Sequence, residues 1–209
     1  MNENENQQFI KHIRSESEEL REDLMGLPIN DFNLVGDFGC GWGYVTYSLA
    51  QEIPASKCIG IDKFDPADPP TLNTGFSLEN IRSWFMGINA ENPPEFRQGN
   101  IVSGENLPFG FDLIYCKRVM YNIFLTGDET ELSQAINHIV QALRPSGWFS
   151  LVEIYESRFK TVLEEILIQA NFAFLHPRYV RRPYKTLLKD YDTYPYLIYQ
   201  CQKGEFHEI

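Results

Sequence analysis

Glycines recur at alternate positions in a short segment near the start of the chain. In residues 35–43 (VGDFGCGWG), an acidic residue precedes three glycines: Asp37, Gly39, Gly41 and Gly43. Glycine lets a backbone turn tightly and approach a ligand closely. In an open parallel sheet, a loop after a strand lies beyond the carboxyl ends of the strands, where ligands bind. The segment therefore predicts a strand–loop–helix unit of an α/β protein, with a ligand site at the loop.

The rest of the chain alternates between short apolar runs and segments whose apolar residues recur at helical spacing. This alternation is typical of a mostly parallel sheet covered by helices on both faces. The spacing predicts helices around 45–53, 132–143 and 162–170, and the Pro-rich residues 64–76 predict a long loop near the carboxyl edge of the sheet. The predicted strands are 33–38, 57–62, 95–99, 111–116, 147–153, 172–176 and 196–202.

The chain divides into an N-terminal part and one larger domain. Residues 1–30 predict an N-terminal helical extension, with one or two exposed amphipathic helices over 7–25 that end at Gly26 and Pro28. Residues 31–209 predict a single α/β domain, because a chain of 209 residues is long enough for one ordinary domain but short for two.

Charge and composition exclude several classes of protein. The formal net charge is -11, and such a surface repels phosphate backbones, so we expect no nucleic-acid partner. The four cysteines form no C-x-x-C pair and the four histidines have no metal-ligand spacing, so we expect neither a disulfide framework nor a metal. No apolar run approaches the ~20 residues of a transmembrane helix. A cytoplasmic protein without a membrane partner follows, of an oligomeric state that the sequence does not indicate.

The glycine spacing separates two kinds of nucleotide-binding loop. A dinucleotide-binding G-x-G-x-x-G loop that began at Gly39 would need a glycine at position 44, which is Tyr44. The observed pattern resembles motif I of the class I S-adenosylmethionine-dependent methyltransferases, D-x-G-x-G-x-G, with Trp42 where that family commonly has Thr or Ser. The resemblance implies that the backbone of the three glycines lies against the methionine and ribose parts of this cofactor. It also implies that Asp37 helps to order the amino group of the cofactor.

An acidic residue, Asp62, ends the next predicted strand in residues 58–62 (CIGID). A carboxylate at this place accepts hydrogen bonds from adjacent ribose hydroxyls. An acid also occurs here in NAD proteins, so Asp62 is informative because of the loop that precedes it. The methyltransferase resemblance makes Asp62 the ribose ligand, with Lys63 and Phe64 beside the adenine.

Residues 99–116 resemble a further run of the same family, written GD…LPF…FDLV. Asn100 replaces the family's acid, which accepts a hydrogen bond from the adenine amino group. The amide oxygen of Asn100 keeps an acceptor at this position, without the charge assistance of a carboxylate. Ile101 and Cys116, in the same run, complete the predicted set of cofactor-binding residues.

Two segments are candidates for the acceptor side of the site. Tyr121 stands where many relatives carry a histidine pair, and it is either a chamber wall, with a candidate catalytic phenol, or part of the core. Residues 178–185 (RYVRRPYK) follow the sixth predicted strand, in a connection that often overhangs the substrate entrance in the family. There Arg181 or Arg182 would hold a small anionic substrate. The alternative is a solvated loop whose cations pair with surface acids.

Together the motifs predict a Rossmann-like α/β fold. The resemblance implies a seven-stranded, mostly parallel sheet with helices on both faces and the last strand antiparallel. The predicted function is S-adenosylmethionine-dependent methyl transfer to a small-molecule acceptor, by in-line displacement at the sulfonium methyl. Two alternatives stay open: an S-adenosylmethionine-binding protein of the same fold with another or no catalytic activity, and an NAD(P)-dependent oxidoreductase.

Overall fold

A computed structural model describes residues 3–55, 57–64, 77–86, 92–185 and 190–204 of the chain. The strands are β1 (Leu34–Phe38), β2 (Lys57–Asp62), β3 (Glu95–Gln98), β4 (Phe111–Lys117), β5 (Leu143–Ile154), β6 (Phe172–Lys185) and β7 (Asp190–Lys203). The α-helices are α1 (Glu3–Asp23), α2 (Tyr44–Glu52), α3 (Leu78–Met86), α4 (Met120–Thr126), α5 (Glu129–Ala142) and α6 (Ser157–Gln169), and a short 3-10 helix spans Ile29–Asp31.

The strands form one sheet in the order β3-β2-β1-β4-β5-β7-β6. The pairs from β3 to β5 are parallel, and β7 runs antiparallel to both β5 and β6. The predicted fold class, a mostly parallel α/β sheet with an antiparallel last strand, is therefore confirmed. The central β1 carries apolar and small residues because both of its faces are covered, as parallel strands require.

The last two strands are longer than the apolar pattern predicts. Residues 178–185, expected in a connection, lie within β6, and 190–195 lie within β7. Charged, aromatic and proline residues in these stretches hide the strand period. Proline is tolerated at Pro183 because β6 is at the edge of the sheet, where one side of the strand has no ladder to complete. Most of the predicted loop 64–76 lies outside the described residues.

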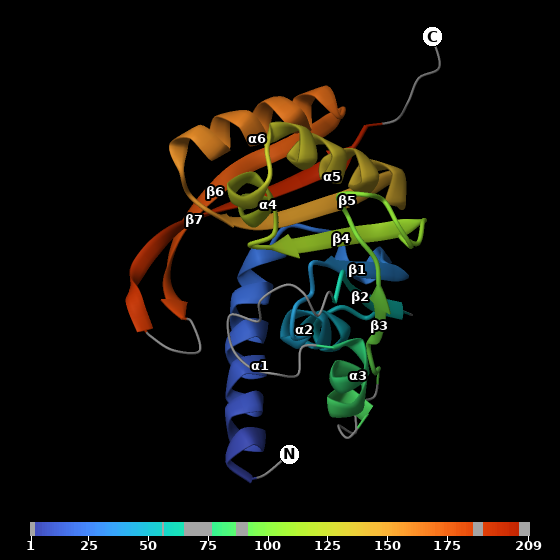
Figure 1. The fold of residues 1–209 in the computed structure, drawn as a ribbon, viewed down its shortest axis with the longest axis vertical. Coiled ribbons are helices and arrows are strands. Elements are labelled where there is room, and N and C mark those ends of the chain that lie inside the picture. Colours follow the sequence, from blue (N-terminus) through green and yellow to red (C-terminus); the bar gives the residue numbers. More distant parts are fainter. Residues whose placement is uncertain (1–2, 56, 65–76, 87–91, 186–189, 205–209) are drawn as a thin grey trace.

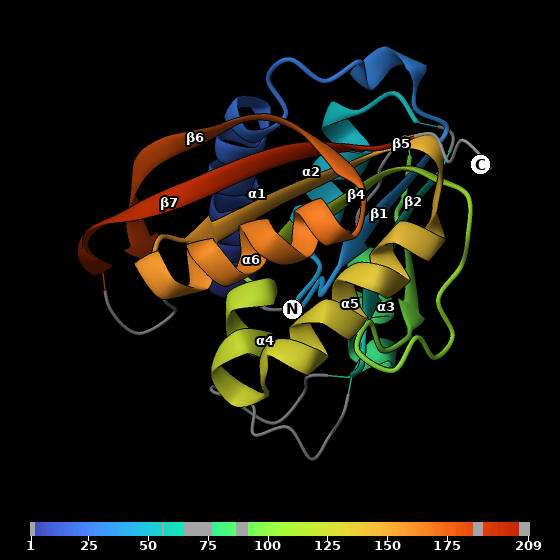
Figure 2. The same cartoon turned by 90° about the horizontal axis from the view of Figure 1, so that it is seen from above.

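Helices cover both faces of the sheet. Figure 1 shows α4, α5 and α6 on one side and α1, α2 and α3 on the other, and Figure 2 shows the first layer from above. Apolar side chains fill the space in each layer, and they include Phe111, Ile136 and Leu163 on the α4–α6 side and Val35, Leu49 and Ile198 on the α1–α2 side. Within the described residues, no helix is both long and apolar enough to cross a membrane.

The first helix differs from the exposed helices that the sequence predicts. Leu20 of α1 and Leu24, the residue after the helix, are buried in the same apolar cluster as Val35 of β1 and Ile53 after α2. Outside this cluster, the Arg21 guanidinium pairs with Glu52 at the end of α2, at 2.6 Å. The helix therefore shares the core of the sheet, and its many charges hid this role in the sequence.

Carboxylates on α1 also meet cations of the sheet in buried ion pairs. Lys117, the last residue of β4, donates to Glu16 at 2.5 Å and to Glu19 at 2.7 Å. Arg182 of β6 lies 2.6 Å from the fully buried carboxylate of Asp23 and 2.7 Å from that of Glu22. Burial raises the pKa of Asp23, against the opposing effect of Arg182, so this carboxylate depends on its partner.

The ion pair gives a test of how α1 is held. Replacing Arg182 with methionine keeps an apolar stem but leaves Asp23 buried without its cation, so we expect a loss of about 3–5 kcal/mol in the free energy of unfolding. The exposed neighbour Arg181 provides the control, because Arg181→Met should change stability by about 0.5 kcal/mol or less. Urea denaturation of both variants measures the difference. Equal losses would show that α1 does not depend on this cation.

Candidate functional site

The glycine loop between β1 and α2 takes a conformation that favours glycine at three positions. Gly39, Gly41 and Gly43 have φ values of 77°, 51° and 80°. A Cβ on Gly39 would lie 2.4 Å from Val119, and one on Gly43 would lie 2.7 Å from Phe96. A Cβ on Gly41 would have no atom within 4 Å, so Gly41 faces open space. The outer glycines therefore serve close packing, whereas Gly41 leaves bare backbone facing open space.

Asp62 connects this loop to the end of β2. Its carboxylate accepts hydrogen bonds from the backbone N–H of Gly41 and of Lys63, each at 2.8 Å. Burial raises the pKa of Asp62, while these backbone donors oppose the rise. The side chain is half-buried, so part of it stays accessible beside the open face of Gly41. The structure thus brings together two residues that the sequence assigned to one ligand, 21 positions apart.

The residues after Asp62 turn back toward the core. Phe64 is 5 % exposed, has a φ of 47°, and packs in a cluster with Phe85 and Phe96. Trp42, from the glycine loop, stacks on Trp84 of α3 with ring centroids 5.2 Å apart. Aromatic side chains therefore surround the side of the loop that faces α3.

Asp37 is placed differently from the expected ligand of the cofactor amino group. Its carboxylate is 2 % exposed and accepts a hydrogen bond from the Thr46 hydroxyl at 2.6 Å. Burial raises the pKa of Asp37 to about 7, against the opposing hydrogen bond from Thr46. In this structure Asp37 ties the end of β1 to α2 from below the loop, and it offers almost no surface to a ligand.

Asn100 also uses its side chain within the protein. Its amide oxygen, predicted to accept from an adenine, accepts instead from the backbone N–H of Val102 at 2.8 Å and of Ser103 at 3.3 Å. This turn fixes the backbone at Ile101, which is 8 % exposed. The physical reason is local, because an asparagine readily bonds the backbone two residues on. The third predicted residue of this run, Cys116, is fully buried in the core on the α4–α6 side, where burial raises the pKa of its thiol.

A buried carboxylate organises the turn after β4. Glu153, near the end of β5, accepts from the backbone N–H of Val119 at 2.9 Å and of Met120 at 2.8 Å. Tyr121, the next residue, is half-buried, and its ring meets Phe159 edge-on with centroids 5.2 Å apart. Glu153 therefore fixes the position of the predicted acceptor-side tyrosine, a role that its sequence context did not reveal.

The two predicted substrate arginines lie on opposite faces of β6. Arg182 is buried beneath α1 in the ion pairs described above, so its charge is already matched within the fold. Arg181 is exposed. It follows Tyr179 on the same face of the strand, and Tyr179 packs edge-on against Tyr155 with ring centroids 5.6 Å apart. Arg181 is thus the one of the two that is placed to meet a ligand.

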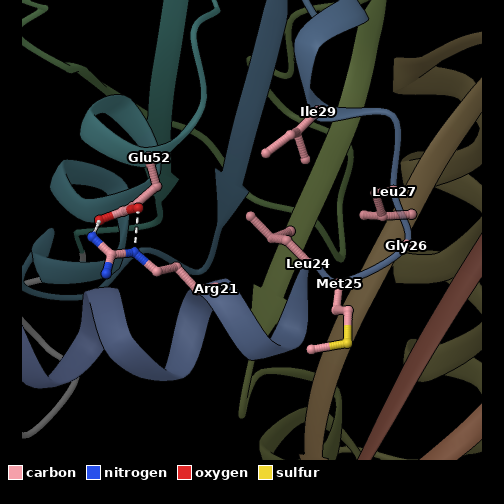
Figure 3. Close-up of a pocket in the computed structure, with 7 residues that line it drawn as sticks. All are labelled: Arg21, Leu24, Met25, Gly26, Leu27, Ile29 and Glu52. Carbon is pink, nitrogen blue, oxygen red and sulfur yellow. Dashed lines mark hydrogen bonds and ion pairs between the residues drawn. The ribbon is translucent and has the colours of Figure 1, made fainter.

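A hollow in the surface lies away from the glycine loop. Figure 3 shows it where α1 ends, lined by Arg21, Leu24, Met25, Gly26, Leu27, Ile29 and Glu52, with a volume of about 270 Å³. Glu52 ends the helix that begins after Gly43, so the hollow and the loop are at opposite ends of α2. None of the predicted site residues lines this hollow. Among the described residues no group of three or more His, Cys, Asp or Glu side chains is arranged to hold a metal ion.

The buried Glu153 carboxyl predicts a pH dependence of stability. Burial raises its pKa from 4.5 to about 8, against the opposing backbone donors, so between these pH values the folded protein holds a proton that the unfolded chain has lost. The free energy of unfolding should therefore fall as pH rises from about 5 to 8, by up to about 1.4 kcal/mol per pH unit. Glu153→Gln should make this fall less steep, as measured by urea denaturation across the range, and the part that comes from the raised pKa of Asp37 should remain.

Glu156, which caps the start of α6, is the matched control for this experiment. It accepts from the backbone at the start of α6, and these hydrogen bonds lower its pKa. The contribution of Glu156 to the free energy of unfolding is therefore present above its ordinary pKa and is lost as pH falls. Glu156→Gln should thus leave the decline in the free energy of unfolding between pH 5 and 8 in place. A Glu153→Gln variant with the wild-type slope would contradict the assignment.

Comparisons with known proteins place this architecture among solved structures. Neither a model of a known protein family nor a curated protein sequence matches the chain. Magnesium protoporphyrin IX methyltransferase from Synechocystis PCC 6803 with bound SAM has a TM-score of 0.62 at 16 % identity, over 93 % of this chain and 81 % of that one. The N-methyltransferase NodS from Bradyrhizobium japonicum WM9, in complex with S-adenosyl-l-homocysteine, also has a TM-score of 0.62 at 16 % identity, over 92 % and 87 %.

A third similar structure is part of a protein complex. It is a chain in the complex of the Haloferax volcanii Trm112 methyltransferase activator, with a TM-score of 0.61 at 14 % identity, over 91 % of this chain and 90 % of that one. Each of these three likenesses covers more than nine tenths of this chain. The chain therefore has the fold of the class I S-adenosylmethionine-dependent methyltransferases.

Proposed function

We propose that the protein transfers a methyl group from S-adenosylmethionine to a small-molecule acceptor. The observation that carries the proposal is the contact between Gly41 and Asp62, which sets bare backbone beside a half-buried carboxylate at the carboxyl edge of the sheet. A nucleoside needs both features, because its hydroxyls require an acceptor and its sugar requires close approach to the backbone. The solved structures with this fold that contain SAM or S-adenosyl-l-homocysteine support the same cofactor.

The residues at the carboxyl edge of the sheet can be assigned to successive parts of this cofactor. The loop at Gly41 would lie against its ribose, and Asp62 would accept from the ribose hydroxyls. Lys63 and Phe64 follow directly and would border the adenine, with Ile101 on the next loop along the same edge. Asn100 would act there through the turn that it holds.

For methyl transfer, the main task of the protein is to align the acceptor with the methyl group of the cofactor. A bound S-adenosylmethionine supplies a methyl group on a sulfonium, which a nucleophile displaces in line. The protein would exclude water and hold the acceptor on this line, and positioning of this kind can lower a barrier by roughly 7–11 kcal/mol. The Glu153 hydrogen bonds hold the turn that carries Tyr121, so this turn would form a fixed wall on the acceptor side.

The acceptor is proposed to be small and to approach from the side of β6. The exposed Arg181 and the pair of Tyr155 and Tyr179 lie on the face of the sheet that α4 and α6 cover. A guanidinium beside aromatic rings suits a small anion with an apolar body. Two of the similar solved structures are, by name, enzymes that methylate other molecules, which supports an enzyme in preference to a protein that only binds the cofactor.

The strand order argues against an NAD(P)-dependent oxidoreductase. The dinucleotide-binding Rossmann fold places its strands in the order 3-2-1-4-5-6, in a mostly parallel sheet. Here the antiparallel β7 lies between β5 and β6. The third glycine of the dinucleotide loop is also replaced, because Tyr44 begins α2 at that position.

Calorimetry tests the cofactor assignment. S-adenosylmethionine and S-adenosylhomocysteine should bind the protein, and NAD should not. Asp62→Ala should weaken binding of both by about 1–3 kcal/mol, because ribose hydroxyls would lose a charged acceptor. Asp128→Ala is the control, since Asp128 caps α5 on the surface and should leave binding unchanged. Equal affinity of wild type and Asp62→Ala would contradict the assignment of the ribose ligand.

Activity is tested separately from binding. Transfer of a labelled methyl group to members of a small-molecule panel, anionic aromatic compounds among them, would establish the enzyme. Tight cofactor binding without methyl loss over a broad panel would favour a cofactor-binding protein of the same fold.

A further inference from the structure

The proposed cofactor raises a question about charge that the glycine loop does not answer. S-adenosylmethionine ends in an α-amino acid, with one ammonium and one carboxylate group. The resemblance assigned the ammonium to Asp37, but that carboxylate is 2 % exposed and bonded to Thr46. A charged group that leaves water needs a partner of opposite charge, so the amino-acid end requires another pair of residues.

Lys117 lies at the right place along the sheet. It ends β4, two residues beyond Tyr115, and Tyr115 is level with Asp37 in the pairing of β1 with β4. Lys117 is therefore level with Gly39, at the start of the glycine loop. Its side chain projects to the α1 face of the sheet and is 8 % exposed. Burial alone would lower the pKa of Lys117, but Glu16 and Glu19 together raise it, so the side chain is a cation.

The first helix runs beside the glycine loop as it reaches Lys117. His12 lies against Tyr44, the residue after Gly43, with ring centroids 5.5 Å apart. Ile13 packs against the cluster that contains Cys40 and Phe64. Glu16 is one helical turn further, and both it and Lys117 influence the pKa of Asp37 beneath the loop. The ion pair of Lys117 with α1 is thus part of the wall around the loop.

The charges in this wall suit a zwitterion. Lys117 meets two carboxylates, Glu16 and Glu19, which are 23 % and 25 % exposed. When an ammonium and a carboxylate of one ligand insert into such a cluster, every charge keeps an opposite partner and none is buried alone. Arg182 also lies 3.8 Å from Glu19, but it is shared with Glu22 and Asp23. In these ion pairs of the described residues, two cations therefore face four carboxylates, and the surplus of negative charge leaves a place for a ligand cation.

We propose that Lys117 binds the carboxylate of the cofactor's amino-acid end and that Glu16 and Glu19 receive its ammonium. This assignment rests on the proposed function and extends it, because it makes α1 one wall of the cofactor site. Asp37 then acts below the loop as a structural residue. The specificity that results is for ligands with an amino-acid end over those with the nucleoside alone.

Two ligands separate this role from a merely structural one. S-adenosylhomocysteine has the amino-acid end, and 5′-methylthioadenosine lacks it. By calorimetry, Lys117→Gln should bind S-adenosylhomocysteine at least 10-fold more weakly than wild type, with 5′-methylthioadenosine unchanged. Lys117→Arg should recover part of the loss. Lys160→Gln, which removes a lysine paired with Glu164 on α6, is the control and should change neither affinity.

Three outcomes would overturn the assignment. Unchanged affinity for S-adenosylhomocysteine would do so directly, and an equal loss for both ligands would show that Lys117 acts only through the fold. Should Lys117→Gln fail to fold, wild-type protein that binds decarboxylated S-adenosylmethionine as tightly as S-adenosylmethionine would also exclude a carboxylate partner. If wild type binds 5′-methylthioadenosine but gains nothing from the amino-acid end, only this assignment fails. If it binds none of these ligands, the proposed function fails with it.

Discussion

The cations buried under the first helix determine where that helix lies. Lys117 and Arg182 come from two strands of the sheet, and each meets carboxylates of α1 at 2.7 Å or less. A helix as charged as α1 has too few apolar residues to fix its position by burial alone. The apolar contacts of Leu20 and Leu24 hold the helix against the sheet, and the ion pairs fix its position there, because a buried charge accepts few alternative partners. The wall beside the glycine loop depends on this arrangement.

The sequence predicted the parts of the fold whose causes are local. The glycine loop after β1, the carboxylate at the end of β2 and most of the strands follow from periodicity and backbone requirements within a few residues. The full lengths of β6 and β7 could not be predicted in this way, because their outer halves are strands only by pairing with each other. The position of α1 against the sheet could not be predicted either, since its partners Lys117 and Arg182 are about a hundred or more positions away in the sequence.

The candidate site divides in the same way. Gly41 and Asp62 were predictable because their roles come from backbone shape and from the end of a strand. Asp37 and Asn100 carry the expected residue types, but local hydrogen bonds with Thr46 and Val102 decide what their side chains do. Glu153 gave little sign of its role, since a carboxylate that caps a distant turn has no sequence pattern. A spacing of three between Glu16 and Glu19 was the one available sign of a helical face with a charged partner.

The distance along the chain between α1 and its partners has a consequence for biosynthesis. The Gln200 amide donates to the Asp23 carbonyl across 177 positions, and Arg182 reaches Glu22 across 160. The helix is made before its partners, and the buried carboxylate of Asp23 has no cation until Arg182 of β6 has left the ribosome. Contacts of such sequence separation form late, because closing long loops is costly before other contacts exist. We therefore expect the part of α1 around Asp23 to be fully docked only once β6 and β7 have formed, and a nascent chain released before β6 would leave this part open to aggregation.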